Sequence, residues 1–326
     1  MGRIACSIRT NASDDETLID STGAVIQNLQ LHLSPLVQEG AGWSSGNGRF
    51  VWMAGDSADP GGLAEVVVSD NSGMTNTPIF ETHNDTLAFP PLISADGSKV
   101  AIVTRYGSPP YYMDYGTLTV VTLGESGDST VVADRHVITT HLPQNASVAL
   151  SPDGSEVAFP DTAGNLIVVS TDGSGVSRTV TSLRSIDRFW YLKGWNMDWS
   201  SQGQLAFTGE GIIRVVSVDG GSLTVVDSGS GFAKWSPDGT KLAYSSMAGD
   251  IMITPDLGKT KTNLTNDKQG NGIPSWSPDG KKIVYTSNVG SFFDQPGLTP
   301  SIVSVDVTTK VKHTLLAGAG LGVWLR

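Results

Sequence analysis

Short apolar and polar runs alternate along this chain in a pattern that repeats. The clearest copy, WSPDGKKIVYTS, spans residues 276–287. Its Trp ends one apolar run, Pro278 and Gly280 are typical of a tight turn, and Asp279 can accept hydrogen bonds from nearby backbone amides. The β-branched and aromatic residues 283–286 predict a second strand. One unit is therefore a strand, a turn and a strand.

The unit recurs along the whole chain. Five further copies carry a few changes each and begin at residues 43, 93, 150, 199 and 235. The chain ends with GVWLR, a first strand that contains Trp324, and begins with RIACSI, a second strand with nothing before it. The two ends complete a seventh unit if the chain closes into a ring, which also removes exposed sheet edges. The seven positions lie 36 to 57 residues apart, enough for four short strands per unit.

These repeats predict an all-β protein, a seven-bladed β-propeller that forms a single domain over residues 1–326. The last blade takes its inner strand from the C-terminus and its other three strands from the N-terminus. A ring of six blades is the alternative. We expect the N-terminal strands at residues 3–10, 17–22 and 25–31, with an acidic loop at 11–16. We expect blades one, two, three and six at residues 41–82, 90–133, 146–181 and 272–317, and blades four and five to be compact.

The WSPDG-type unit resembles the Tol-type propeller repeat, which occurs in the periplasmic translocation protein of the Tol system and in many secreted bacterial propellers. Propeller domains of prolyl-oligopeptidase-family enzymes are similar. The resemblance covers essentially the whole chain and implies the propeller fold. The same fold hosts binding modules, lyases and enzyme lids, so it does not decide between them. Unlike the Tol translocation protein, this chain shows no separate N-terminal α/β domain.

Loop lengths divide the predicted ring into two faces. In an antiparallel blade the SPDG turns lie on one face, whereas the loops after second strands and the links between blades lie on the other. All the long insertions belong to the second class. Because variable loops on a rigid scaffold usually carry function, we expect this long-loop face to be the working face. Its insertions and links are residues 106–116, 182–195, 291–300, 83–89 and 136–145.

Aromatic residues are concentrated in these insertions. Exposed aromatic rings are rigid, amphipathic anchors for proteins or for the faces of sugars. The alternative is that several of them pack the loops onto the ends of the blades. The ligand-binding candidates are Tyr106, Tyr111, Tyr112, Tyr115, Phe189, Trp190, Tyr191, Phe292 and Phe293.

Three histidines, His83, His136 and His141, fall on predicted links of the same face. With Tyr111, Tyr112, Arg135 or Arg188 they could supply a base and a positive charge for β-elimination from a uronate polymer, the chemistry of propeller lyases. Nothing in their spacing is specific for that chemistry, and solvated or hydrogen-bonded loop histidines are the simpler interpretation. We therefore assign no catalytic residue, and a lyase remains an alternative.

Sequence motifs for metal binding or for a catalytic nucleophile give little evidence of an active site. No HxH or HExxH motif is present, so we assign no metal site and no cofactor. Calcium could bind acidic stretches such as residues 14–16, or Asp56 with Asp59, although no EF-hand spacing occurs. Residues 42–46, GWSSG, match a nucleophile elbow in letters, but that motif requires a strand, a turn and a helix.

The repeated Trp and Asp residues have structural explanations. The Trp residues at positions 43, 199, 235, 276 and 324 share one repeat position and are expected in the core between blades. The aspartates recur because tight turns need them. These turn aspartates are Asp96, Asp153, Asp238 and Asp279.

The composition of the chain bears on which partners the protein binds and on where in the cell it is located. The net charge is −11 without a Lys/Arg stripe, which argues against nucleic acid and anionic membranes. No run of 18 apolar residues is present, so we expect no membrane insertion. Cys6, the single cysteine, is expected to be a small core residue. Met1 and Gly2 lie directly against the first predicted strand, so we expect an exported protein whose leader is absent here; a cytoplasmic one is not excluded.

These features favour a non-catalytic binding module of an exported bacterial protein, which presents the long-loop face to a protein or a glycan. A polysaccharide lyase with its site at the channel mouth is the first alternative. A structural component of a cell-surface assembly is the second. A lyase needs a base and a cation within hydrogen-bond reach of each other, whereas a binding module needs an apolar patch with a polar rim.

Overall fold

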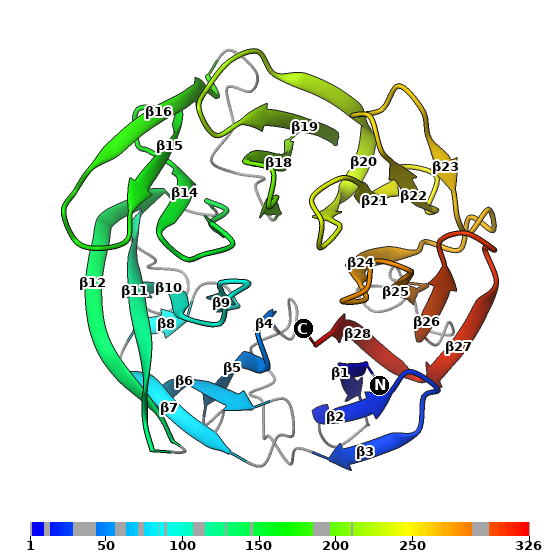
Figure 1. The fold of residues 1–326 in the computed structure, drawn as a ribbon, viewed down its shortest axis with the longest axis horizontal. Helices are drawn as coiled ribbons and strands as arrows, with labels where there is room; N and C mark the ends of the chain where they lie inside the picture. Colours follow the sequence, from blue (N-terminus) through cyan, green and yellow to red (C-terminus); the bar gives the residue numbers. More distant parts are fainter. Residues whose placement is uncertain are drawn as a thin grey trace.

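The strands of the chain are arranged as a ring of antiparallel sheets in the computed structural model (Figure 1). Among the described residues no helix is long and apolar enough to span a membrane. The structure describes residues 2–9, 14–28, 44–55, 63–70, 75–83, 85–87, 90–106, 115–127, 129–143, 146–184, 196–209, 211–288 and 300–325.

We number the blades in chain order. Blade one contains β4 (Ser44–Gly46), β5 (Arg49–Gly55), β6 (Leu63–Asp70) and β7 (Asn76–His83). Blade two contains β8 (Asp85–Leu87), β9 (Leu92–Ile93), β10 (Lys99–Tyr106), β11 (Tyr115–Ser126) and β12 (Ser129–Pro143). Blade three contains β13 (Ala149–Leu150), β14 (Glu156–Pro160), β15 (Asn165–Ser170) and β16 (Ser177–Ser182).

Blades four and five share one strand, β20 (Thr224–Trp235), which pairs with β19 up to Ser228 and with β21 from Gly229 onward. Blade four also contains β17 (Met197–Trp199), β18 (Gln204–Gly209) and β19 (Ile212–Ser217). Blade five also contains β21 (Leu242–Ser246), β22 (Ile251–Thr254) and β23 (Thr262–Asn263). Blade six contains β24 (Gly272–Trp276), β25 (Lys282–Ser287), β26 (Ser301–Asp306) and β27 (Lys312–Ala317).

Blade seven joins the two ends of the chain, which lie close together in Figure 1. Its inner strand β28 (Ala319–Trp324) pairs with β1 (Arg3–Arg9), and β2 (Asp14–Asp20) and β3 (Val25–Asn28) follow outward. The predicted closure by both termini is therefore confirmed. The acidic loop predicted at residues 11–16 is wrong in part, because residues 14–16 belong to β2 and extend its ladder with β1.

Two further boundaries differ from the prediction. The link expected at residues 83–89 contains β8, which pairs with the far end of β10, so blade two has an inner strand in two pieces. The link expected at 136–145 is mostly β12, a strand of 15 residues. The polar run Asp134-Arg135-His136 resembles a linker, but β12 is the outermost strand of its blade, where solvent accommodates polar side chains.

Apolar side chains between neighbouring blades form the core. Among the described residues, seven clusters of buried side chains each join one blade to the next around the ring. Between blades five and six, for example, Trp276 and Tyr285 are 2% and 1% exposed and pack with Ile253. Both faces of each blade are covered in this way. Trp235, Trp276 and Trp324 are core residues, as predicted, whereas Trp199 is only partly buried and Trp43 lies outside the described residues.

The SPDG turns have the geometry that their sequence predicts. Ser236 Oγ donates a hydrogen bond to Asp238 Oδ1 at 2.5 Å, and the backbone nitrogen of Thr240 donates to the same oxygen at 3.0 Å. Gly239 follows with a φ of 70°, which a side chain would resist. The equivalent serine also bonds to Asp96, Asp153 and Asp279, which supports the structural role assigned to these aspartates.

Neighbouring turns also bond to one another. Arg49 Nη1 of blade one donates to Gly97 O at 3.0 Å, and the amide of Asp96 donates to Pro152 O of blade three at 3.0 Å. Gln202 Nε2 of blade four donates to Asp238 O at 3.1 Å. This face is therefore a connected set of short turns.

Replacement of Trp276 with Ala should lower the free energy of unfolding by about 3–5 kcal/mol, because it opens a cavity between two blades. It also removes the 2.9 Å hydrogen bond from Nε1 to Lys234 O. Urea titration measures the loss. Val225→Ala is the control, since that side chain is 61% exposed and should cost less than about 0.5 kcal/mol. Equal losses in the two variants would contradict the role of Trp276.

Acid should weaken the SPDG turns. Hydrogen bonds from Ser236 and Thr240 lower the pKa of Asp238 to about 2. Because this pKa lies below the unfolded value of about 3.9, the carboxylate stabilises the fold above pH ~4 and loses that effect as the pH falls toward 2. Ser236→Ala should raise the pKa of Asp238 toward its ordinary value, measured by carboxyl-carbon NMR titration. An unchanged pKa would show that the serine does not hold the carboxylate.

Candidate functional site

The long-loop face is defined by the connections between second and third strands and by the links between blades. Three of its long connections join β10 to β11, β16 to β17 and β25 to β26. Most of the predicted site residues belong to these connections and lie outside the described residues. They are Tyr111, Tyr112, Arg188, Phe189, Trp190, Tyr191, Phe292 and Phe293.

Two predicted residues meet at the edge of this face. Tyr115 is the first residue of β11, rather than part of a loop, and its backbone pairs with Pro143 at the end of β12. Its ring contacts the ring of His141, with centroids 5.7 Å apart and planes tilted by 58°. Tyr115 remains 45% exposed, so the pair presents an aromatic surface to solvent.

Threonines hold the imidazole of this pair. Thr140 Oγ1 lies 3.0 Å from His141 Nδ1, and the backbone nitrogen of His141 donates to Thr139 Oγ1 at 3.1 Å. The resulting patch combines a tyrosine, a histidine and hydroxyl groups, which suits contact with a polar ligand that has an apolar face. Tyr106 ends β10, and His83 ends β7, but the side chains of both lie outside the described residues.

His136 does not lie on a link of the long-loop face, so that prediction is wrong. It sits within β12, the outermost strand of blade two, where its Nε2 lies 2.9 Å from Asp134 Oδ2. A Cβ at Gly173 would lie 2.6 Å from His136 Nδ1, so this glycine lets the imidazole pack against a turn of blade three. The place of His136 is at the rim of the ring, away from the inner strands.

Arg135, the neighbour of His136 in β12, contacts the blade on the other side. Its Nη2 donates to Ile79 O of blade one at 2.9 Å, and its guanidinium carbon lies 5.0 Å from the centre of the Phe80 ring. Successive side chains of a strand point to opposite sides. Arg135 and His136 therefore fasten β12 to both neighbouring blades, a structural role for residues that the sequence left available for chemistry.

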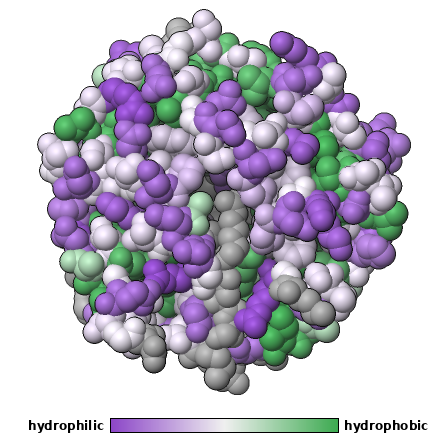
Figure 2. Space-filling view, in the orientation of Figure 1, coloured by the Kyte–Doolittle hydropathy of each residue, from purple (hydrophilic) through white to green (hydrophobic). Residues whose placement is uncertain are grey.

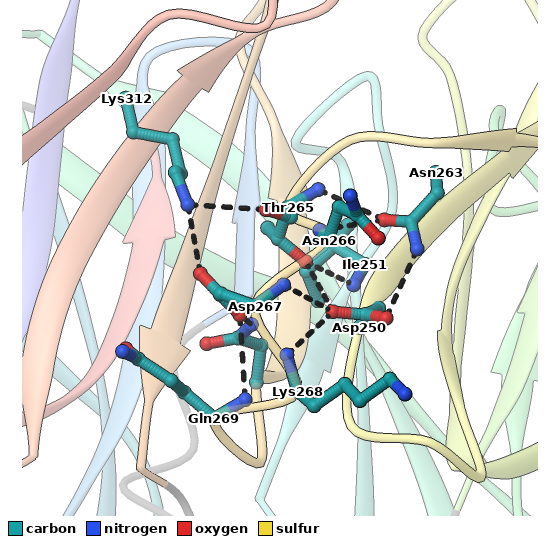
Figure 3. Close-up of polar contacts among 10 residues, drawn as sticks. Asp250, Ile251, Asn263, Thr265, Asn266, Asp267, Lys268, Gln269 and Lys312 are labelled. Carbon is teal, nitrogen blue, oxygen red and sulfur yellow. Dashed lines mark hydrogen bonds and ion pairs between the residues drawn. The ribbon is translucent and has the colours of Figure 1, made fainter.

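A polar network that the sequence did not predict lies where blade five is linked to blade six (Figure 3). Asp250 is 3% exposed and follows the turn between β21 and β22. Its carboxylate accepts hydrogen bonds from the side chains of Asn263 and Thr265, at 2.9 and 3.2 Å. It also accepts from the backbone nitrogens of Asp267 and Lys268, both at 2.9 Å.

The network extends to blade six through one lysine. Lys312 Nζ of β27 donates to Asp267 Oδ2 at 2.8 Å and to Thr265 O at 3.1 Å. Burial by itself raises the pKa of Asp250, but the four hydrogen bonds outweigh it and the pKa is lowered. The carboxylate is thus ionised and saturated with donors, which suits a structural anchor for the link better than a catalytic group.

The candidates for a metal site and for a catalytic nucleophile can be assessed in the part of the chain that the structure describes. There, no three His, Cys, Asp or Glu side chains are grouped so that they could hold a metal ion. The acidic side chains considered for calcium, at positions 14–16, 56 and 59, lie outside the described set. Ser44–Gly46 of the GWSSG run form β4, which pairs with β5 and leads to no helix, unlike a nucleophile elbow.

The surface of the described residues is mostly polar in the view of Figure 2. Hydrophilic and intermediate side chains cover most of the visible surface, and hydrophobic ones are scattered, many of them toward the rim. This agrees with the net charge of −11.

Comparison with known proteins identifies the fold alone. No protein-family model and no curated protein sequence matches the chain. Solved structures do match. TolB from Acinetobacter baumannii is 15% identical, with a TM-score of 0.53, and the match covers 98% of this chain and 82% of that one.

The chain is a β-propeller. Two other matches have unrelated roles: an oligogalacturonate lyase in complex with manganese and a chain of the mitotic checkpoint complex. The lyase is 13% identical with a TM-score of 0.58, covering 89% of this chain and 82% of that one. The checkpoint chain is 14% identical with a TM-score of 0.55, covering 92% and 83%. At such identities the likeness extends to the scaffold and not to its chemistry.

Replacement of Asp250 with Ala should lower the free energy of unfolding by about 2–4 kcal/mol, since it leaves buried donors without an acceptor. Asp219→Ala provides the control, because Asp219 is an exposed aspartate in a turn of blade four. Urea titration of both variants gives the comparison. If the two variants unfold at the same urea concentration, Asp250 does not anchor the link.

Proposed function

We propose that this protein is a non-catalytic interaction module, a Tol-like propeller that presents its long-loop face to a protein or a glycan outside the cytoplasm. One observation carries the proposal. The described members of the candidate catalytic set, His136 and His141, lie on the outermost strand of a blade, and their polar and ring partners Asp134, Thr140 and Tyr115 belong to that same blade. General acid–base chemistry would need such groups to converge on one reacting atom.

The Tyr115–His141 pair supplies the complementary argument. It is exposed, it lies at the long-loop end of β11 and β12, and the hydroxyls of Thr139 and Thr140 contact its histidine. Flat rings beside hydrogen-bonding groups suit both sugar faces and protein hot spots. The aromatic residues predicted on the neighbouring connections would extend this patch.

The comparisons agree with this proposal at the level of the scaffold. TolB shares the fold, and another match is a chain of a multi-protein complex. The likeness to an oligogalacturonate lyase keeps uronate polymers among the glycans to be tested. The net charge of −11 disfavours nucleic acid as the partner.

Tyr115→Ala should weaken binding about tenfold, because truncation of one exposed aromatic anchor removes on the order of 1–2 kcal/mol. The measurement is retention on a glycan array that includes polygalacturonate and alginate, and on a panel of purified cell-envelope proteins. Val176→Ala is the matched control, since that side chain is 68% exposed beside a turn on the opposite face.

Three outcomes separate the alternatives. Retention that is lost in Tyr115→Ala and kept in Val176→Ala supports the proposed face. Release of unsaturated uronate product, followed by its ultraviolet absorbance, would show a lyase and overturn the non-catalytic assignment. Equal retention of both variants would move the binding site away from Tyr115, and no retention on any probe would favour a structural component of an assembly.

A further inference from the structure

Three buried hydroxyl groups occupy the same place in three consecutive blades. Thr208, Ser245 and Thr286 each follow the aromatic residue of the second strand of blades four, five and six. They are 9%, 0% and 1% exposed. None of the three hydroxyls has a hydrogen-bond partner among the protein atoms of the described residues. Such groups are rare in native proteins and call for a physical explanation.

Each hydroxyl faces the next blade around the ring. Ala206, two residues before Thr208, packs with Trp235 of blade five. Ala243, two residues before Ser245, packs with Trp276 of blade six. Val284 stands in the same relation to Thr286 and packs against blade seven. Side chains two residues apart in a strand point to the same side of the sheet. The hydroxyls therefore lie in the three crevices between blades four and five, five and six, and six and seven.

Across each crevice lies the inner strand of the next blade, and the pairing of this strand is irregular near the hydroxyl. In blade five, residues 230–232 form a bulge between the pairs of Gly229 and Ala233 with β21. In blade six, residues 273–274 form a bulge between the pairs of Gly272 and Ser275 with β25. In blade seven the pairing between β28 and β1 shifts at residue 321. A bulge leaves backbone groups of the inner ladder unpaired.

The bulge in blade six is strained as well. Ile273 has a φ of 58°, an uncommon conformation for a β-branched residue. The preceding Asn271 is 3% exposed, and its Oδ1 also has no partner in the described chain. An unpartnered hydroxyl and an unpartnered amide oxygen therefore lie in the region where blades five and six meet.

Other blades provide an internal comparison. At the same repeat position blade two has Val103 and blade three has Pro160, neither of which carries a hydroxyl. These residues face blades three and four. The inner strands of those two blades, β13 and β17, pair with their neighbours without any shift of register. Among blades two to six, the hydroxyl and the shift of register in the facing inner strand thus occur together and are missing together.

We propose that the crevices between blades four and five, five and six, and six and seven each bind one ordered internal water. The water accepts from or donates to the hydroxyl on one side and pairs with backbone groups of the bulge on the other. Buried waters typically make about three such hydrogen bonds. A monovalent cation could use the same oxygens, but it would leave each hydroxyl proton without an acceptor.

The sign of the stability change tests this proposal. Removing an unpaired buried hydroxyl should raise the melting temperature, whereas removing one that holds a structural water should lower it. We expect Thr208→Val, Ser245→Ala and Thr286→Val each to melt about 2 °C lower than wild type in scanning calorimetry. Val103→Thr is the control, because a new hydroxyl in a crevice without a bulge should also lower the melting temperature.

A crystal structure at high resolution tests for the proposed waters directly. We expect a density peak within hydrogen-bond distance of each hydroxyl, and the loss of the corresponding peak in Thr286→Val. Three variants that melt at or above the wild-type temperature would overturn the proposal, as would wild-type crystals without the peaks. A wild-type melting temperature that falls when choline replaces sodium and potassium would show a cation in place of water.

Discussion

Apolar packing between neighbouring blades is the constraint on which the rest of the structure depends. Each blade is a small sheet with two apolar faces, and neither face is covered unless another blade lies beside it. The ring satisfies this requirement only if the last blade meets the first. The pairing of β28 with β1 supplies that contact, and Leu325 packs against Phe50 and Trp52 of blade one. Closure therefore follows from the need to bury the same kind of surface at every blade.

The same arrangement gives the two faces of the ring different characters. On one face, short SPDG turns are saturated by their own serine and aspartate side chains and bond to the turns beside them. On the other, the connections vary in length and include the exposed Tyr115–His141 pair. A rigid face and a variable face are what a binding scaffold requires, because loops can change while the packed blades keep them in place.

Parts of the candidate site could be predicted and parts could not. Tyr115 and His141 stand out as an aromatic residue and a histidine near strand ends, and both lie at the expected edge. His136 was misplaced because a polar run within an outer strand resembles a linker. Asp250 gave no signal at all, since a single aspartate after a glycine resembles any turn residue. Its partners come from a segment more than ten residues away and become visible only when β22 and β23 are paired.

The sequence by itself determined the repeating unit, the turns and the closure by both termini, because these depend on residue types a few positions apart. The tertiary structure alone decided which side chains share a crevice. It also decided that β20 runs from one blade into the next and that β12 is fastened to two neighbours through Arg135 and His136. Contacts of this kind depend on the twist and register of whole sheets, and no local pattern encodes the distance between two blades.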